Sequence, residues 1–295
     1  MPPEFRTRFA PSPTGPLHLG HAFSAILAHD MAISEGGQFL LRIEDIDRSR
    51  ARPEWEQQLY DDLEWLGLQW PEPVMRQSDR SAAYGAALDD LWSRDYLYPC
   101  TCSRRDVQEA VSAPQEGAYL YGPDGIIYPR TCPKSLFGLP CSLSERPAGQ
   151  TLRLDIRQAN WTAEPSLEGP RWCFNESGPS HRGIIAFTPE AMDRQVGDIV
   201  LARQGMGTSY HLSVVLDDAA QGITHVVRGE DLFDATKIHV VLQKLLQLPT
   251  PSYHHHRLIR DIAGKRLAKR DDARALSLYR RDGATPCDIR RMVGL

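Results

Sequence analysis

The spacing of hydrophobic and polar residues changes three times near the start of the chain. From residue 5 to residue 10, arginines alternate with phenylalanine and threonine, which predicts a β-strand. After a turn rich in proline and glycine at 11–16, apolar side chains recur every three or four positions over 18–34 and predict a helix with one buried face. A short apolar run at 38–44 predicts a second strand. A strand, a tight turn, a helix and a strand in forty residues indicate a βαβ unit opening a parallel nucleotide-binding sheet.

The rest of the chain divides into regular and irregular parts. A helical pattern covers 53–66, strand-like patterns cover 211–216 and 223–228, and apolar residues at helical spacing follow over 238–246. Between 100 and 188 periodicity is poor, and proline, glycine and cysteine are frequent. We interpret this stretch as a module inserted between two βα halves and lying outside the parallel sheet, so that the predicted fold class is α/β.

Composition limits the kind of protein. Of the 295 residues, 41% are hydrophobic and 24% charged, which is typical of a folded globular chain. No stretch approaches the roughly 20 apolar residues that cross a bilayer, and the first residues do not resemble a secretion signal. We therefore expect a cytoplasmic protein without membrane contact.

Charge is unevenly distributed. The net charge is −4, which does not indicate a nucleic-acid-binding protein, but residues 257–295 hold eleven Lys/Arg against five Asp/Glu, a local charge of +6. Such a region suits phosphate groups or an RNA backbone. A solvated charged helix would be an equally good interpretation of the tail alone.

The turn before the first helix carries candidate chemistry. It places a helix N-terminus at the carboxyl end of a strand, where backbone N–H groups and the helix dipole favour ATP phosphates. His18 and His21 are three positions apart and can donate hydrogen bonds to oxygens that carry developing negative charge. Gly20 has no side chain, so adenine could pack against its backbone. An isolated histidine pair with this spacing is also common at protein surfaces.

Four stretches together resemble a known family. The run from Arg8 to His21 resembles the HIGH motif of class I aminoacyl-tRNA synthetases, in the form of the glutamyl-tRNA synthetases. Residues 41–48 and 227–232 look like two further blocks of that family, and 266–270 is similar to its KMSKS motif. The resemblance covers Arg6 to about Arg270. It implies a Rossmann-like parallel sheet with an inserted, zinc-containing module and a short helical C-terminal region.

The resemblance implies an ATP site. His18, Gly20, His21, Arg266 and Lys269 would bind ATP, which carries Mg²⁺, and His18, His21 and Lys269 would be catalytic. The second motif departs from the family pattern, because arginine replaces the first lysine at 266 and alanine replaces the serine at 268. The departure makes the assignment of Arg266 weaker than that of Lys269.

The resemblance also implies a pocket for L-glutamate. Arg8 and Ser12 would contact the bound amino acid, and Glu44 would hold its ammonium group. Tyr210 and Arg228 would complete the pocket. The alternatives are ordinary surface ion pairs for the two arginines and a core position for the tyrosine.

The inserted module holds a candidate metal site. Cys100 and Cys102 form a C-x-C pair, and Cys132 follows later; thiolates in such a pattern bind Zn²⁺ tetrahedrally. A fourth ligand is then needed. The resemblance to a short branch of the family implies Tyr128 in that place, whereas Cys141 is the chemically more ordinary candidate. The absence of any metal is the remaining alternative.

We assign no metal site to the other cysteines or to the histidine cluster. Cys173 and Cys287 have no partner in sequence and are expected to be buried. His254, His255 and His256 are expected in a loop near ATP.

The motifs suggest a division of the chain. The first half of the catalytic domain would span 1–99, the inserted module 100–188, the second half 189–250, and the KMSKS-like loop with a short helical tail 251–295. The residues that follow 270 are too few for the anticodon-binding domain of a glutamyl-tRNA synthetase.

The short chain therefore resembles the glutamyl-queuosine tRNA(Asp) synthetases, a short branch of the family. This resemblance implies activation of L-glutamate with ATP and transfer of the glutamyl group to queuosine in the anticodon of tRNA(Asp), by a monomer. The alternatives are a truncated enzyme that charges tRNA(Glu) and a non-catalytic RNA-binding paralogue.

Overall fold

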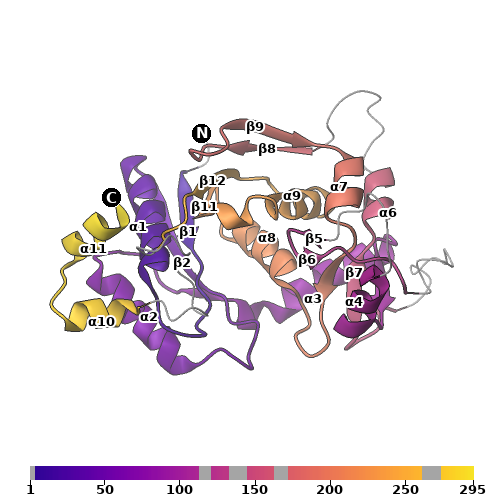
Figure 1. Cartoon of the computed structure of the whole chain (residues 1–295), viewed down its shortest axis with the longest axis horizontal. Coiled ribbons are helices and arrows are strands. Elements are labelled where there is room, and N and C mark those ends of the chain that lie inside the picture. Colours follow the sequence, from indigo (N-terminus) through magenta and orange to yellow (C-terminus); the bar gives the residue numbers. More distant parts are fainter. Residues whose placement is uncertain (1–3, 113–120, 133–144, 163–171, 261–273) are drawn as a thin grey trace.

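A parallel sheet near the N-terminus carries the first motif. The computed structural model describes residues 4–112, 121–132, 145–162, 172–260 and 274–295 (Figure 1). Strand β1 (Arg6–Phe9) pairs with β2 (Gln38–Ile43), which also pairs with β3 (Met75–Arg76), all in parallel. Helix α1 (Leu19–Ser34) links β1 to β2, and α2 (Pro53–Trp65) follows β2. The predicted βαβ unit and the helix after it are confirmed.

A second set of parallel strands lies beside β1. Strand β11 (His225–Gly229) pairs in parallel with β12 (Ser252–His256). The backbone N–H of Thr224 donates to the carbonyl of Arg6 at 3.1 Å, so the start of β11 lies beside the start of β1. Helix α9 (Thr236–Leu245) follows β11 after a short 3₁₀ turn, η3 (Glu230–Leu232). The predicted strand at 223–228 and helix at 238–246 are confirmed.

Two predictions for this half are wrong. Residues 211–216 belong to helix α8 (Tyr210–Ala220), not to a strand. Burial of neighbouring side chains on this helix hides the helical period, and the hydroxyl of Ser209 caps it by accepting from the N–H of Leu212. The histidines at 254–256 lie in strand β12, not in a loop.

An antiparallel sheet carries much of the central region. Strand β7 (Thr151–Leu154) lies between β4 (Leu97–Cys100) and β10 (Ile199–Ala202). The helices and short elements of this part of the structure are η1 (Gln77–Arg80), α3 (Ser81–Ser93), α4 (Arg104–Ser112), β5 (Tyr121–Gly122), β6 (Gly125–Ile126), α6 (Ile156–Thr162) and α7 (Pro189–Gln195).

The predicted inserted module is not separate from the parallel strands throughout. Strand β8 (Trp172–Glu176) pairs in parallel with β12 and antiparallel with β9 (Gly183–Phe187). The expectation that 100–188 lies outside the sheet is therefore wrong for these strands. Cys173 on β8 is exposed rather than buried, because side chains on this strand alternate between core and solvent.

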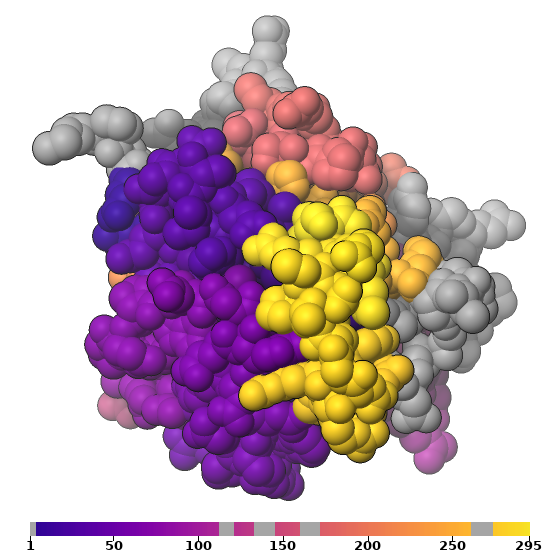
Figure 2. Space-filling view, turned by 90° about the vertical axis from the view of Figure 1, so that its left-hand side faces the viewer, coloured from indigo at the N-terminus to yellow at the C-terminus, as the bar shows by residue number. Residues whose placement is uncertain are grey.

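The C-terminal residues pack against the first half. Helices α10 (Leu276–Arg281) and α11 (Pro286–Val293) form a ridge beside the N-terminal part of the chain (Figure 2). The N–H of Leu276 donates to the carbonyl of Leu17 at 2.8 Å, next to the HIGH-like motif. Cys287 on α11 is exposed, contrary to expectation, because it lies on the outer face of this short helix.

No helix in the described part of the chain has the length and apolar character needed to cross a membrane.

Candidate active site

The predicted ATP and glutamate residues surround one cleft. The cleft has a volume of about 650 Å³ and opens where β1 and β11 end, the usual ligand position in a parallel α/β sheet. All predicted residues of these two sets that the structure describes contribute to its wall: Arg8, Ser12, His18, Gly20, His21, Glu44, Tyr210 and Arg228. Arg266, Ala268 and Lys269 lie outside the described residues.

The two motif histidines are fixed at the start of α1. His18 Nδ1 accepts from the backbone N–H of Gly20 at 3.1 Å, and His21 Nδ1 accepts from the N–H of His18 at 3.2 Å. The two rings lie 3.8 Å apart between centroids. Because both Nδ1 atoms act as acceptors, each neutral ring carries its proton on Nε2. The pair thus holds two N–H donors at a helix N-terminus, which suits phosphate oxygens.

Gly20 has a further structural reason to be glycine. A Cβ at this position would lie 3.0 Å from Cε1 of His18. A side chain there would push against the imidazole that the Gly20 N–H orients. The contact with His18 therefore favours glycine at this position independently of adenine packing.

One wall of the cleft is a buried ion-pair cluster. Asp218 on α8 accepts from Arg8 Nε at 3.0 Å and from Arg42 Nη1 at 2.6 Å. Arg42 also donates from Nη2 to Glu44 at 3.2 Å. Two guanidinium groups and two carboxylates thus meet at the ends of β1 and β2, and we call these four residues the Asp218 cluster.

Burial and charge act differently on the two carboxyl groups. Burial raises the pKa of Glu44, and the nearby Arg42 and Arg8 only partly oppose it. Burial also acts to raise the pKa of Asp218, but Arg8 and Arg42 outweigh it and hold this pKa below its usual value. Glu44 thus has room for a further cation, whereas Asp218 already has two.

A second part of the cleft wall is built around Arg228 at the end of β11. Its side chain donates to Nε2 of His255 at 3.1 Å, Nδ1 of His239 at 3.0 Å and Oγ1 of Thr236 at 2.6 Å. Tyr210 stands nearby at the start of α8, 5.7 Å from His239 between ring centroids. No carboxylate among the described residues hydrogen-bonds to Arg228.

Sequence reasoning missed the partners that hold these groups. Arg42 and Asp218 are buried, and they are 176 positions apart in the chain. The charged Arg42 in the otherwise apolar run 39–43 was a usable signal, since buried charges are usually paired. His239 and His255 gave no comparable signal, because they stand among apolar and histidine neighbours.

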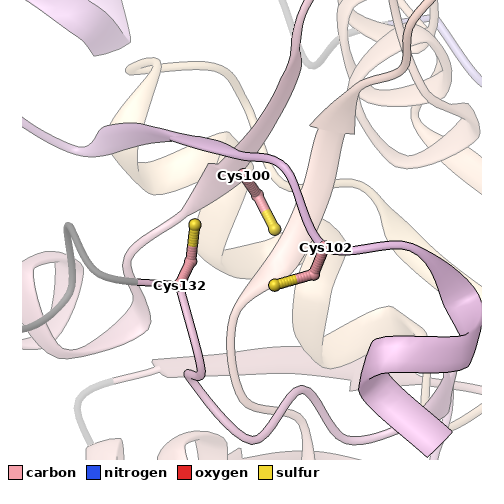
Figure 3. Close-up of side chains that lie close together, drawn as sticks. All are labelled: Cys100, Cys102 and Cys132. Carbon is pink, nitrogen blue, oxygen red and sulfur yellow. The ribbon is translucent and has the colours of Figure 1, made fainter.

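Three of the predicted metal ligands lie close together. The sulfur atoms of Cys100, Cys102 and Cys132 all lie within 4.8 Å of one another, a possible metal site, and the side chains point toward a shared space (Figure 3). The hydroxyl of Tyr128 is 3.5 Å from the Cys100 sulfur and 3.2 Å from the Cys102 sulfur. Cys141 lies outside the described residues.

Comparison with known proteins settles the family. The sequence model of the family described as "tRNA synthetases class I (E and Q), catalytic domain" matches residues 4–118 and 174–295. The chain belongs to this family. The predicted α/β fold with the parallel sheet of a class I catalytic domain is confirmed.

Individual relatives narrow the resemblance. The chain is 64% identical over 289 residues to the glutamyl-Q tRNA(Asp) synthetase of Rhodobacter capsulatus, covering 98% of this chain and 99% of the relative. It is 39% identical over 274 residues to the protein of the same name from Geobacter sulfurreducens, covering 92% and 78%. The sequence-based identification of the short glutamyl-queuosine branch is thereby confirmed.

Solved structures support the same family. The glutamate–tRNA synthetase of Elizabethkingia anophelis superposes with a TM-score of 0.66 at 25% identity, covering 91% of this chain and 53% of that one. The glutamate tRNA ligase of Elizabethkingia meningosepticum, solved in complex with its amino acid, gives 0.65 at 26% identity, covering 91% and 52%. The chain spans about half the length of these solved proteins.

Proposed function

We propose that this protein activates L-glutamate with ATP and transfers the glutamyl group to queuosine in the anticodon of tRNA(Asp). The observation that carries the proposal is the meeting, in one cleft, of the His18–His21 pair with Glu44 and Arg228. The high identity to relatives named glutamyl-Q tRNA(Asp) synthetases supports the acceptor.

Activation needs alignment rather than a protein nucleophile. An oxygen of the glutamate α-carboxylate attacks the α-phosphorus of ATP, and the bond to the leaving pyrophosphate breaks. The Nε2–H groups of His18 and His21 donate to phosphate oxygens as their charge increases. Mg²⁺ accompanies ATP. Arg266 and Lys269 are proposed to bind the phosphates from the second motif.

The two walls of the cleft divide the recognition of glutamate. Glu44, whose pKa is raised by burial in spite of Arg42 and Arg8, accepts hydrogen bonds from the ammonium group. Arg228 binds the side-chain carboxylate, with Tyr210 beside it. Arg8 and Ser12 complete the pocket near the α-carboxylate.

Transfer follows from the mixed anhydride. A hydroxyl oxygen of queuosine attacks the carbonyl carbon of glutamyl-adenylate, an ester bond forms, and AMP leaves with the electron pair of the broken bond. The proton of the hydroxyl passes to AMP or to solvent.

The acceptor is tested by labelling. Radioactive glutamate, ATP and unfractionated tRNA are incubated with the protein, and the labelled tRNA is identified by hybridisation. We expect label on tRNA(Asp), absent when the tRNA comes from cells without queuosine. Label on tRNA(Glu) instead would support the truncated charging enzyme. A lack of both label and glutamate-dependent ATP–pyrophosphate exchange would support the non-catalytic RNA-binding paralogue.

We further propose a structural Zn²⁺ held by Cys100, Cys102, Cys132 and Tyr128. Burial opposes ionisation of the Cys100 thiol, but its hydrogen bond with Tyr128 and the one that Arg153 Nε donates to it at 3.3 Å lower its pKa. A thiolate is the form that binds zinc. The metal would join the end of β4 to the segment 128–132.

Metal content tests the fourth ligand. Purified wild-type protein should contain one zinc per chain, and Tyr128→Phe should lose zinc to a chelator faster. Tyr121→Phe is the matched control, because Tyr121 is exposed and stands in the same segment. If Cys141→Ser releases zinc and Tyr128→Phe does not, Cys141 is the ligand.

A further inference from the structure

Arg228 is held at three of its nitrogen atoms. Its Nε donates to His255, its Nη1 to His239, and its Nη2 to the hydroxyl of Thr236 and, at 3.3 Å, to the carbonyl of Leu232. These bonds fix the plane of the guanidinium group. One Nη1–H then has no acceptor among the described residues, and the side chain lines the cleft.

The bond to His239 begins a chain of hydrogen bonds that leaves the cleft. His239 Nε2 lies 3.1 Å from Nδ1 of His211, and His211 Nε2 lies 3.3 Å from Oδ1 of Asp124. Asp124 stands in the turn between β5 and β6, outside the residues that line the cleft and outside those that the family model matches. We call His239, His211 and Asp124 the Asp124 chain.

Each bond of the Asp124 chain has only one possible direction. Arginine has no acceptor, so Nδ1 of His239 must accept and its proton must be on Nε2. That proton is donated to Nδ1 of His211, whose own proton is then on Nε2 and faces the carboxylate of Asp124. The acceptor at the far end therefore stabilises the same tautomer of His239 that the contact with Arg228 requires.

Burial keeps this arrangement neutral at its inner end. Only 2% of the surface of His239 is exposed, and burial together with the adjacent Arg228 lowers the pKa of His239 well below its usual value. Asp124 carries the negative charge, since His211 holds its pKa below the usual range in spite of burial. Its side chain is 39% exposed, so the outer end of the chain lies near the surface.

We propose that Asp124 acts through His211 and His239 to position Arg228, so that the β5–β6 turn tunes the affinity for glutamate. The proposal rests on the proposed function, in which Arg228 binds the side-chain carboxylate. If Asp124 is lost, His239 can place its Nδ1 proton against the Arg228 N–H, which is repulsive and turns the guanidinium away. Asp124 is thus a positioning residue rather than a catalytic one.

The experiment compares variants of Asp124 in glutamate-dependent ATP–pyrophosphate exchange. Asp124→Leu removes the acceptor and should raise the KM for glutamate about tenfold, with kcat and the KM for ATP within a factor of two. Asp124→Asn keeps an oxygen acceptor for His211 and should restore most of the affinity. Tyr121→Ser, in the same hairpin, should match wild type because its side chain is exposed.

A spectroscopic signature separates positioning from general damage. ¹⁵N NMR of the histidine rings should show the Nε2–H tautomer of His239 in wild type and in Asp124→Asn, and a mixture in Asp124→Leu. An unchanged KM for glutamate in Asp124→Leu would overturn the inference, as would equal increases in the KM for ATP and for glutamate. If wild type shows no glutamate-dependent exchange, the proposed function fails. If wild type is active and the Asp124 variants have the same KM for glutamate as wild type, this inference alone fails.

Discussion

The proposed amino-acid pocket holds its two arginines in different ways. Arg8 shares the carboxylate of Asp218 with Arg42, inside a cluster whose two positive and two negative charges balance. Arg228 is held by two imidazoles, a hydroxyl and a carbonyl, all neutral acceptors. Both arginines are buried to about the same extent, at 5% and 6% exposure, so the difference lies in their partners.

This difference in partners indicates that the two arginines have different roles. A carboxylate partner offsets the positive charge of an arginine and weakens its attraction for an anionic ligand. Neutral acceptors do not offset that charge, so an arginine held by them attracts an anionic ligand more strongly. The matched family covers both E and Q synthetases. We propose that a charged Arg228 facing the cleft favours the carboxylate of glutamate over the amide of glutamine, while the Asp218 cluster places Arg8 in the pocket and leaves Glu44 for the ammonium group.

Removing the shared carboxylate should have the largest effect. Asp218→Asn leaves the buried Arg8 without a counter-charge and Arg42 with Glu44 alone, and should lower the free energy of unfolding by about 3–5 kcal/mol. Urea unfolding measures the change. Asp90→Asn is the control, because its ion pair with Arg94 is exposed and should contribute about 0.5 kcal/mol. A loss below about 1 kcal/mol for Asp218→Asn would show that the cluster is not a structural unit.

Replacing the other arginine should affect binding more than folding. Arg228→Gln keeps polar contacts with the histidines but removes the charge, and should raise the KM for glutamate at least about thirtyfold, or roughly 2 kcal/mol. The KM for ATP should stay near the wild-type value in the exchange assay. Arg105→Gln serves as the control, because this arginine is exposed on α4. An equal increase in the KM for glutamate and in the KM for ATP would contradict the assignment of Arg228 to glutamate binding.

Acid should weaken glutamate binding through Glu44. The carboxylate must be ionised to hold the ammonium group, and burial raises its pKa above the usual range in spite of Arg42 and Arg8. Affinity is then complete above this raised pKa and falls as the pH decreases through it, by up to about tenfold per pH unit. As the pH is lowered, the KM for glutamate should begin to rise at a pH higher than it would if the Glu44 side chain had the ordinary pKa of about 4.3. Glu44→Gln should have a high KM without this dependence.

The sequence predicted the parts whose pattern is local. The βαβ unit at 5–44 has clear strand and helix periods, and the structure agrees. Helix α8 was predicted as a strand because its neighbouring positions are almost all buried, which removes the contrast between two faces. The pairing of β8 with β12 joins residues such as Glu176 and Tyr253, which no local pattern connects.

The site shows the same division. Family motifs named the residues that face the cleft, and the structure brings the described ones together. The residues that support them, Asp218 for Arg8 and His239 for Arg228, come from helices that lack any motif, and only the folded chain places them. That the buried arginines need polar or charged partners could be predicted from the sequence, but which residues supply them could not.

Amino-acid specificity in the exchange reaction tests the assignment of Arg228 most directly. ATP–pyrophosphate exchange is measured with glutamate and with glutamine, for wild type and for Arg228→Gln. We expect wild type to respond to glutamate at least about a hundredfold better than to glutamine, since a buried guanidinium is left without a counter-charge by the amide. Arg228→Gln should lose most of this preference. Equal exchange of wild-type protein with glutamine, or an undiminished preference in the variant, would contradict it.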